Sequence, residues 1–112
     1  MGLILAPLPS AKVEAWKAFI AETNGPRKDE FDGFNRRYGL TKHEAWLAET
    51  PAGTFVVAIH EGPGAADMMG KVAQSTHDFD KWFVSRLVDI HGMDLTKPPP
   101  GPMPERKLAW NA

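Results

Sequence analysis

The order of apolar and polar positions divides the N-terminal third of the chain into one strand and two helices. Residues 3–6 form an apolar run that stops at Pro7, which predicts a short β-strand. Apolar residues then recur at helical spacing over residues 10–23 and again over residues 26–39, where Gly39 is suited to end a helix. The predicted inner stripes are Val13, Trp16, Phe19 and Ile20 in the first helix and Phe31, Phe34 and Tyr38 in the second.

The middle of the chain predicts a β-hairpin. Residues 54–61 are rich in β-branched and aromatic side chains, and the segment 42–49 precedes them across a turn-forming stretch at 50–53. The start of 42–49 also matches a helical capping box, so a short helix there is an alternative, although it would leave the 54–61 strand without its neighbour. With the loop at 50–53, His43 lies opposite His60.

The last part of the chain predicts helices and then a proline-rich connector. A short helix is expected over residues 65–73, and a longer one over residues 76–91 ends at Gly92. The connector at 97–104 is too rich in proline for a helix or a central strand, and residues 106–110 can form a final strand. The longer helix carries an apolar face made of Phe79, Trp82, Phe83, Leu87 and Ile90.

This order of elements predicts one α+β domain over residues 1–112. The order matches the ferredoxin-like βαββαβ plan, in which helices cover one face of a four-stranded antiparallel sheet. Both faces of the hairpin are largely apolar, whereas a solvent-exposed face of an antiparallel sheet would be polar. We therefore expect a homodimer in which a second copy covers one face, and the expected interface holds Ala45, Leu47, Val56 and Ala58.

Three stretches of sequence resemble a known superfamily. They are Trp46-Leu47 before Thr50-Pro51, then His77-Asp-Phe-Asp-Lys-Trp-Phe83, and then Asp89-Ile-His-Gly-Met-Asp-Leu95 followed by Pro-Gly-Pro102. Over nearly its whole length the chain is similar to small bacterial proteins of the dimeric α+β barrel superfamily. The resemblance implies a relation to antibiotic-biosynthesis-monooxygenase-like and muconolactone-isomerase-like proteins, and so a cofactor-independent monooxygenase or isomerase-like activity on an aromatic or polyketide-like substrate.

Composition and charge narrow the function classes. Thirteen basic and fourteen acidic side chains give a net charge of −1, whereas proteins that bind nucleic acid or anionic membranes usually carry an excess of positive charge. The absence of cysteine excludes disulfides, thiolate catalysis and most zinc motifs. No stretch reaches the roughly 18 apolar residues that a membrane span needs, and no signal-peptide pattern is present, so we expect a cytoplasmic protein.

Histidines are the candidates for chemistry, because imidazole titrates near neutral pH. We predict His60 and His91 as general bases, with His43 beside His60 as a ligand-binding residue. The structural alternatives are strand-end histidines near solvent for the pair and a cation at a helix C-terminus for His91. The spacing of the histidines matches no metal motif, so we expect no metal ion and no cofactor.

A pocket for a small apolar or aromatic ligand is the second expectation. Arg36 would hold an anionic group of that ligand, with Tyr38, Trp46 and Trp82 lining the pocket. The same aromatic residues are equally suited to the core. Whether the protein is an enzyme is left open by the sequence, and the alternative is a non-catalytic ligand-binding or protein-interaction module whose aromatic residues form the core and the dimer interface.

Overall fold

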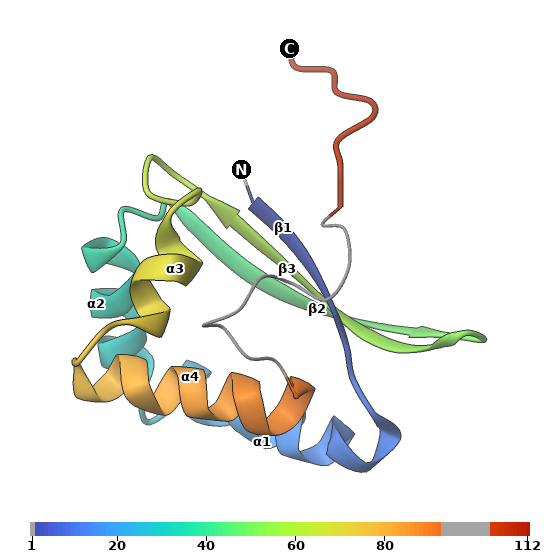
Figure 1. Cartoon of the computed structure of the whole chain (residues 1–112), viewed down its shortest axis with the longest axis horizontal. Coiled ribbons are helices and arrows are strands. Elements are labelled where there is room, and N and C mark those ends of the chain that lie inside the picture. Colours follow the sequence, from blue (N-terminus) through green and yellow to red (C-terminus); the bar gives the residue numbers. More distant parts are fainter. Residues whose placement is uncertain (1, 93–103) are drawn as a thin grey trace.

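The computed structural model describes residues 2–92 and 104–112 and shows a mixed α+β fold (Figure 1). Strand β1 (Gly2–Pro7) leads through a short 3₁₀ turn, η1 (Ser10–Lys12), into helices α1 (Val13–Asn24) and α2 (Lys28–Arg37). The hairpin β2 (Lys42–Thr50) and β3 (Gly53–Glu61) follows, and then helices α3 (Met68–Ala73) and α4 (Asp78–His91). The strands form an antiparallel sheet in the order β1-β3-β2, so β3 is central.

The hairpin register is the predicted one. His43 pairs with His60 and Leu47 pairs with Val56, so the alternative of a short helix over 42–49 is wrong. The turn is tighter than expected, because Thr50 pairs directly with Gly53. The Thr50 hydroxyl donates to the Gly53 carbonyl at 2.7 Å and accepts a bond from the Ala52 N–H at 3.2 Å, which stabilises this turn.

The helices lie where the apolar periodicity places them, with small differences at their ends. The first helix begins three residues later than predicted, because Ser10–Lys12 form the 3₁₀ turn and α1 begins at Val13. The predicted stop of α4 is confirmed, since Gly92 has a φ of 65° and its N–H bonds to the Val88 carbonyl. Only glycine adopts this left-handed conformation without strain.

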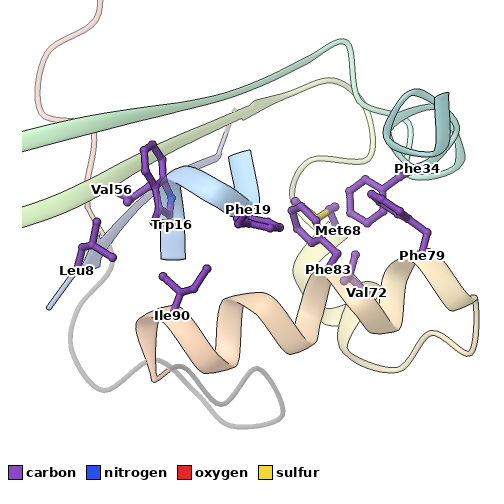
Figure 2. Close-up of a cluster of buried hydrophobic side chains, with 10 residues drawn as sticks. All are labelled: Leu8, Trp16, Phe19, Phe34, Val56, Met68, Val72, Phe79, Phe83 and Ile90. Atoms are coloured by element: carbon purple, nitrogen blue, oxygen red, sulfur yellow. The ribbon is translucent and has the colours of Figure 1, made fainter. Parts of the chain in front are cut away.

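The core lies between the helices and one face of the sheet (Figure 2). Phe79, Phe83 and Ile90 of α4 are buried together with Trp16 and Phe19 of α1. Trp82 and Leu87 are partly buried and pack against the same cluster, as the spacing on α4 predicts. The remaining members of the core are Leu8, Phe34, Val56, Met68 and Val72.

The prediction of which sheet face meets a partner is wrong. The face that carries Ala45, Val56 and Ala58 is the one that faces the helices, because these residues line a cavity together with side chains of α1 and α4. The opposite face, which we call the outer face, has no helix over it within the described residues. Its apolar members are Leu3, Leu5, Trp46, Phe55, Val57 and Ile59.

The C-terminal segment differs from the prediction. Residues 104–112 have no regular secondary structure and are exposed, so the expected strand over 106–110 is not formed, and the described part of the chain holds three strands rather than four. These residues pair with no strand, and the edge of β1 that does not pair with β3 stays open. The connector at 97–104 lies outside the described residues apart from Pro104. No helix among the described residues is long and apolar enough to span a membrane.

Candidate functional site

A cavity of about 150 Å³ lies between the helices and the sheet. Small side chains from all three strands form its floor, with Ala6 on β1, Ala45 on β2 and Ala58 on β3. Aromatic side chains of the helices, including Trp16 and Phe83, form its walls. An apolar cavity of this volume accepts a molecule about the size of benzene.

Three of the four histidines line this cavity, and two of them touch each other. The Nε2 atoms of His43 and His60 are 3.2 Å apart, and the two rings meet edge to face with their centroids 4.5 Å apart. On its other side, His43 Nδ1–H donates to the side-chain oxygen of Asn35 at 2.8 Å. The structure therefore forms a row of three polar side chains that runs from α2 across β2 to β3.

The end of β3 that carries His60 is held by backbone hydrogen bonds to the connection between α2 and β2. The Thr41 N–H bonds to the Glu61 carbonyl at 2.7 Å, and the Gly64 N–H bonds to the Gly39 carbonyl at 3.1 Å. A Cβ atom at Gly64 would lie 1.8 Å from the Tyr38 carbonyl oxygen, so only glycine fits there. This contact fixes the loop after β3 against the connection between α2 and β2, next to the histidine pair.

Burial keeps both histidines of the pair neutral. Burial, and repulsion from His60 when that ring is also protonated, lower the pKa of His43 to about 3, and burial lowers the pKa of His60. His60 is only 4% exposed, which does not fit the alternative of a strand-end histidine near solvent.

This pair predicts that the protein loses stability as the pH falls below about 6.5. His43 stays neutral in the folded protein down to a pKa of about 3, but takes up a proton in the unfolded chain below its ordinary pKa of 6.5. Between these values the unfolded chain binds more protons. The free energy of unfolding should therefore fall by up to about 1.4 kcal/mol per pH unit for His43 alone, measured by urea denaturation from pH 7 to pH 4.

The variant His43→Gln should flatten this slope, because it removes the buried imidazole from the cavity. Asp80 contributes in a separate range, because its pKa is lowered from 3.8 to about 2 and its stabilisation is lost only as the pH falls through that range. Equal slopes in the parent and in His43→Gln would show that His43 does not titrate as described.

His91 lies at the other end of the cavity. Its Nδ1–H donates to the Pro7 carbonyl at 3.0 Å, whereas His60 pairs with Gly2 at the opposite end of β1. The five residue steps from Gly2 to Pro7 separate the two ends by roughly 16 Å. Burial lowers the pKa of His91, which disfavours its alternative role as a helix-end cation. The two predicted catalytic histidines therefore share a cavity without touching.

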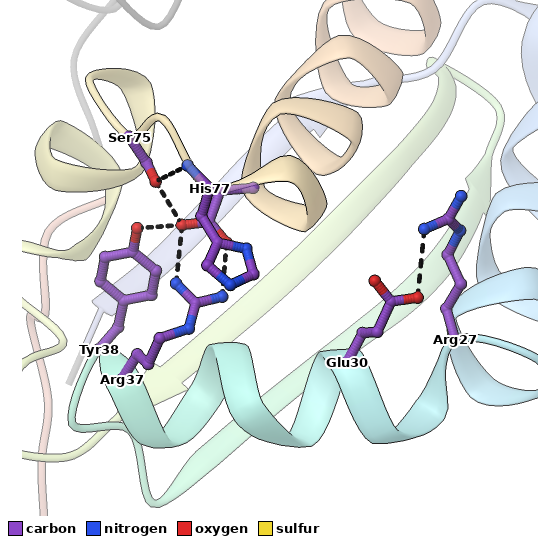
Figure 3. Close-up of polar contacts among 7 residues, drawn as sticks. Arg27, Glu30, Arg37, Tyr38, Ser75 and His77 are labelled. Carbon is purple, nitrogen blue, oxygen red and sulfur yellow. Dashed lines mark hydrogen bonds and ion pairs between the residues drawn. The ribbon is translucent and has the colours of Figure 1, made fainter.

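Arg36, the predicted ligand-binding arginine, is exposed, whereas the neighbouring Arg37 contacts the buried side chain of Asp80. Arg37 donates to both carboxylate oxygens of Asp80, at 3.0 and 2.8 Å, while Arg36 points to solvent. Tyr38 and Ser75 donate to the same carboxylate (Figure 3). Burial alone would raise the pKa of Asp80, but the hydrogen bonds from these three residues, together with the charge of Arg37, outweigh it and lower the pKa to about 2. Tyr38 thus belongs to a bridge between α2 and α4.

The two predicted tryptophans lie away from the cavity. Trp46 is on the outer face and is 60% exposed. Trp82 packs between the rings of Phe19 and Phe79, with the Arg27 guanidinium 4.3 Å from its ring centre. Of the predicted ligand-binding residues, only His43 lines the cavity.

Two residues with buried or half-buried polar contacts were not predicted from the sequence. Asn35 contacts His43 beside the cavity, and Asp80 joins α2 to α4. No motif or periodicity singles out either one, because each acts on a side chain that is distant in sequence or on another element. Among the described residues, no group of three or more histidine, cysteine or acidic side chains is placed to hold a metal ion. Comparisons of the chain with protein-family models, with curated proteins and with solved structures found no match.

Proposed function

We propose that the protein binds a small ring-shaped organic molecule in the cavity and removes a proton from it. The observation that carries this proposal is the neutral pair of His43 and His60 at one end of an apolar cavity. A neutral imidazole has a free lone pair that can accept a proton from a bound molecule at neutral pH. Burial disfavours the resulting imidazolium, and the negative charge left on the bound molecule would offset this cost, because opposite charges attract more strongly between apolar walls.

Proton removal is the first step of both activities implied by the family resemblance. In a cofactor-independent monooxygenase, molecular oxygen reacts with the deprotonated ring, and in an isomerase the proton returns to a different atom. The cavity of about 150 Å³ admits one ring. An aromatic or polyketide-like substrate would therefore place one ring beside the histidines and leave the rest of the molecule outside the cavity.

Phenol and benzene test this proposal, because they have nearly the same size and differ by one O–H donor. Phenol should bind about fivefold more tightly, since its hydroxyl can donate to the histidine pair and such a bond contributes about 1 kcal/mol. Isothermal titration calorimetry of the full chain with each probe measures the ratio of the two dissociation constants.

The variant His60→Phe keeps a ring at this position but removes both nitrogens, so the advantage of phenol should disappear while benzene still binds. The matched control is His77→Phe, at an exposed histidine outside the cavity, which should leave both affinities unchanged. If neither probe binds the parent protein, the small-molecule proposal fails and the non-catalytic interaction module becomes the better explanation.

We further propose that the protein forms a homodimer through its outer face. Leu5, Val57 and Trp46 lie side by side across the three strands of this face, and Leu5 and Trp46 are at least half exposed, at 50% and 60%. A second copy related by a two-fold axis presents the same apolar row, so that the two rows cover each other. This arrangement explains why both faces of the sheet are apolar while helices cover only one of them.

A further inference from the structure

The row Asn35, His43 and His60 has a direction that is set at its first residue. A side-chain carbonyl oxygen of asparagine can only accept hydrogen bonds, so the ring nitrogen 2.8 Å from it, Nδ1 of His43, must carry the hydrogen. A neutral imidazole has a single N–H, which leaves Nε2 of His43 as an acceptor. The Nε2 of His60, 3.2 Å away, is therefore the donor.

This direction leaves one basic nitrogen in the row, Nδ1 of His60. Within residues 2–92 and 104–112, every fully buried side-chain nitrogen or oxygen has a hydrogen-bond partner. The only bond of the His60 ring in this part of the chain is the one from Nε2 to His43. Its Nδ1 is therefore not fully enclosed by these residues. It lies on the side of the His60 ring that faces Gly2, where glycine leaves space beside the ring, and the ring itself lines the cavity.

Asn35 itself does not line the cavity. It is half-buried on α2, and its side-chain oxygen reaches His43 rather than the space that a ligand would occupy. Any influence of Asn35 on a bound molecule must therefore pass through the histidine rings.

We infer that Asn35 is a positioning residue that fixes the hydrogen positions on both rings and so makes Nδ1 of His60 the base of the site. This inference rests on the proposed function, to which it adds the reacting atom. When Nδ1 of His60 takes a proton from a bound molecule, the ring becomes a cation that still donates from Nε2 to His43. Asparagine cannot accept a proton, so the charge stays on His60, and the proton can return to the molecule from the same nitrogen.

Nitrogen NMR of the uniformly ¹⁵N-labelled full chain tests the direction of the row without any ligand. Long-range ¹H–¹⁵N correlation at neutral pH distinguishes protonated from unprotonated ring nitrogens, and the His60→Phe spectrum assigns the His60 signals. The expected result is a hydrogen on Nδ1 of His43 and on Nε2 of His60. A hydrogen on Nε2 of His43 instead would overturn the inference.

The variant Asn35→Leu tests the role of the amide, because leucine has a similar size but no acceptor. It should give a mixture of both hydrogen positions on His43, and should reduce the advantage of phenol over benzene from about fivefold to about twofold while benzene binding is unchanged. Asn35→Asp retains the acceptor and should restore both the single hydrogen position and the preference for phenol.

The matched control is Asn24→Leu, which removes the same amide from the cavity wall without a contact to His43. It should leave the hydrogen positions unchanged. Retention of the parent hydrogen positions in Asn35→Leu would refute the positioning role. If the parent protein shows the expected hydrogen positions but no preference for phenol, the proposed function fails while the role of Asn35 as the residue that orients His43 still stands.

Discussion

Replacing Val57 by aspartate should convert the proposed dimer into a folded monomer. Val57 is central on the outer face, where it pairs with Leu5 on one side and with Trp46 on the other. In the dimer the new carboxylate would be buried without a partner and would meet its own copy across the two-fold axis. A penalty of about 4 kcal/mol raises the dissociation constant roughly a thousandfold.

Light scattering at micromolar concentration, together with circular dichroism, measures this effect. Ala66→Asp adds the same charge at an exposed position between β3 and α3 and should leave the dimer intact. Val56→Asp is an informative contrast, because Val56 is buried against the helices and its replacement should unfold the protein rather than only separate two copies. A parent chain that is monomeric at these concentrations would refute the dimer.

Truncating Asp80 to alanine should lower the free energy of unfolding by about 3 to 5 kcal/mol. Its side chain is fully buried and accepts hydrogen bonds from Arg37, Tyr38 and Ser75. Truncation leaves these donors without their acceptor and leaves the Arg37 guanidinium without its counter-ion. Because Arg37 is partly exposed and can be rehydrated, we expect a value near the lower end of this range.

Urea denaturation at neutral pH measures the loss, with Asp78→Ala as the matched control. Asp78 lies in the same first turn of α4 but is exposed, so its truncation should change stability by less than about 1 kcal/mol. Asp80→Asn keeps the shape but loses the charge, and it should fall between the parent and Asp80→Ala. A loss below about 1 kcal/mol in Asp80→Ala would mean that the bridge between α2 and α4 is not structural.

The hairpin and most helix faces could be predicted because they depend on local periodicity. A two-residue period and a short turn determine that His43 lies opposite His60. The face that receives the helices could not be predicted in the same way, because Ala45 and Val56 on one side and Trp46 and Val57 on the other give nearly the same apolar pattern. The choice is made by the packing of helices that are distant in sequence.

The polar contacts could not be predicted residue by residue either. The sequence indicated Arg36 as the functional arginine at the end of α2. In the structure the neighbouring Arg37 contacts Asp80 instead, because successive helical residues point about 100° apart. Its partner Asp80 is 43 positions away along the chain. Such a pair has no local signature, and the same is true of the contact between Asn35 and His43, which joins a helix to a strand.

The alanine floor of the cavity would act as a size filter. Ala6, Ala45 and Ala58 sit on hydrogen-bonded strands, and a paired backbone cannot recede to admit a larger guest. The volume of the cavity would then depend on how many methyl groups these three positions carry. A change from alanine to valine at one of them would exclude larger molecules without altering the polar groups. In the proposed function, selectivity for size would depend on the alanines and proton transfer on the histidines, so that each property could vary while the other is retained.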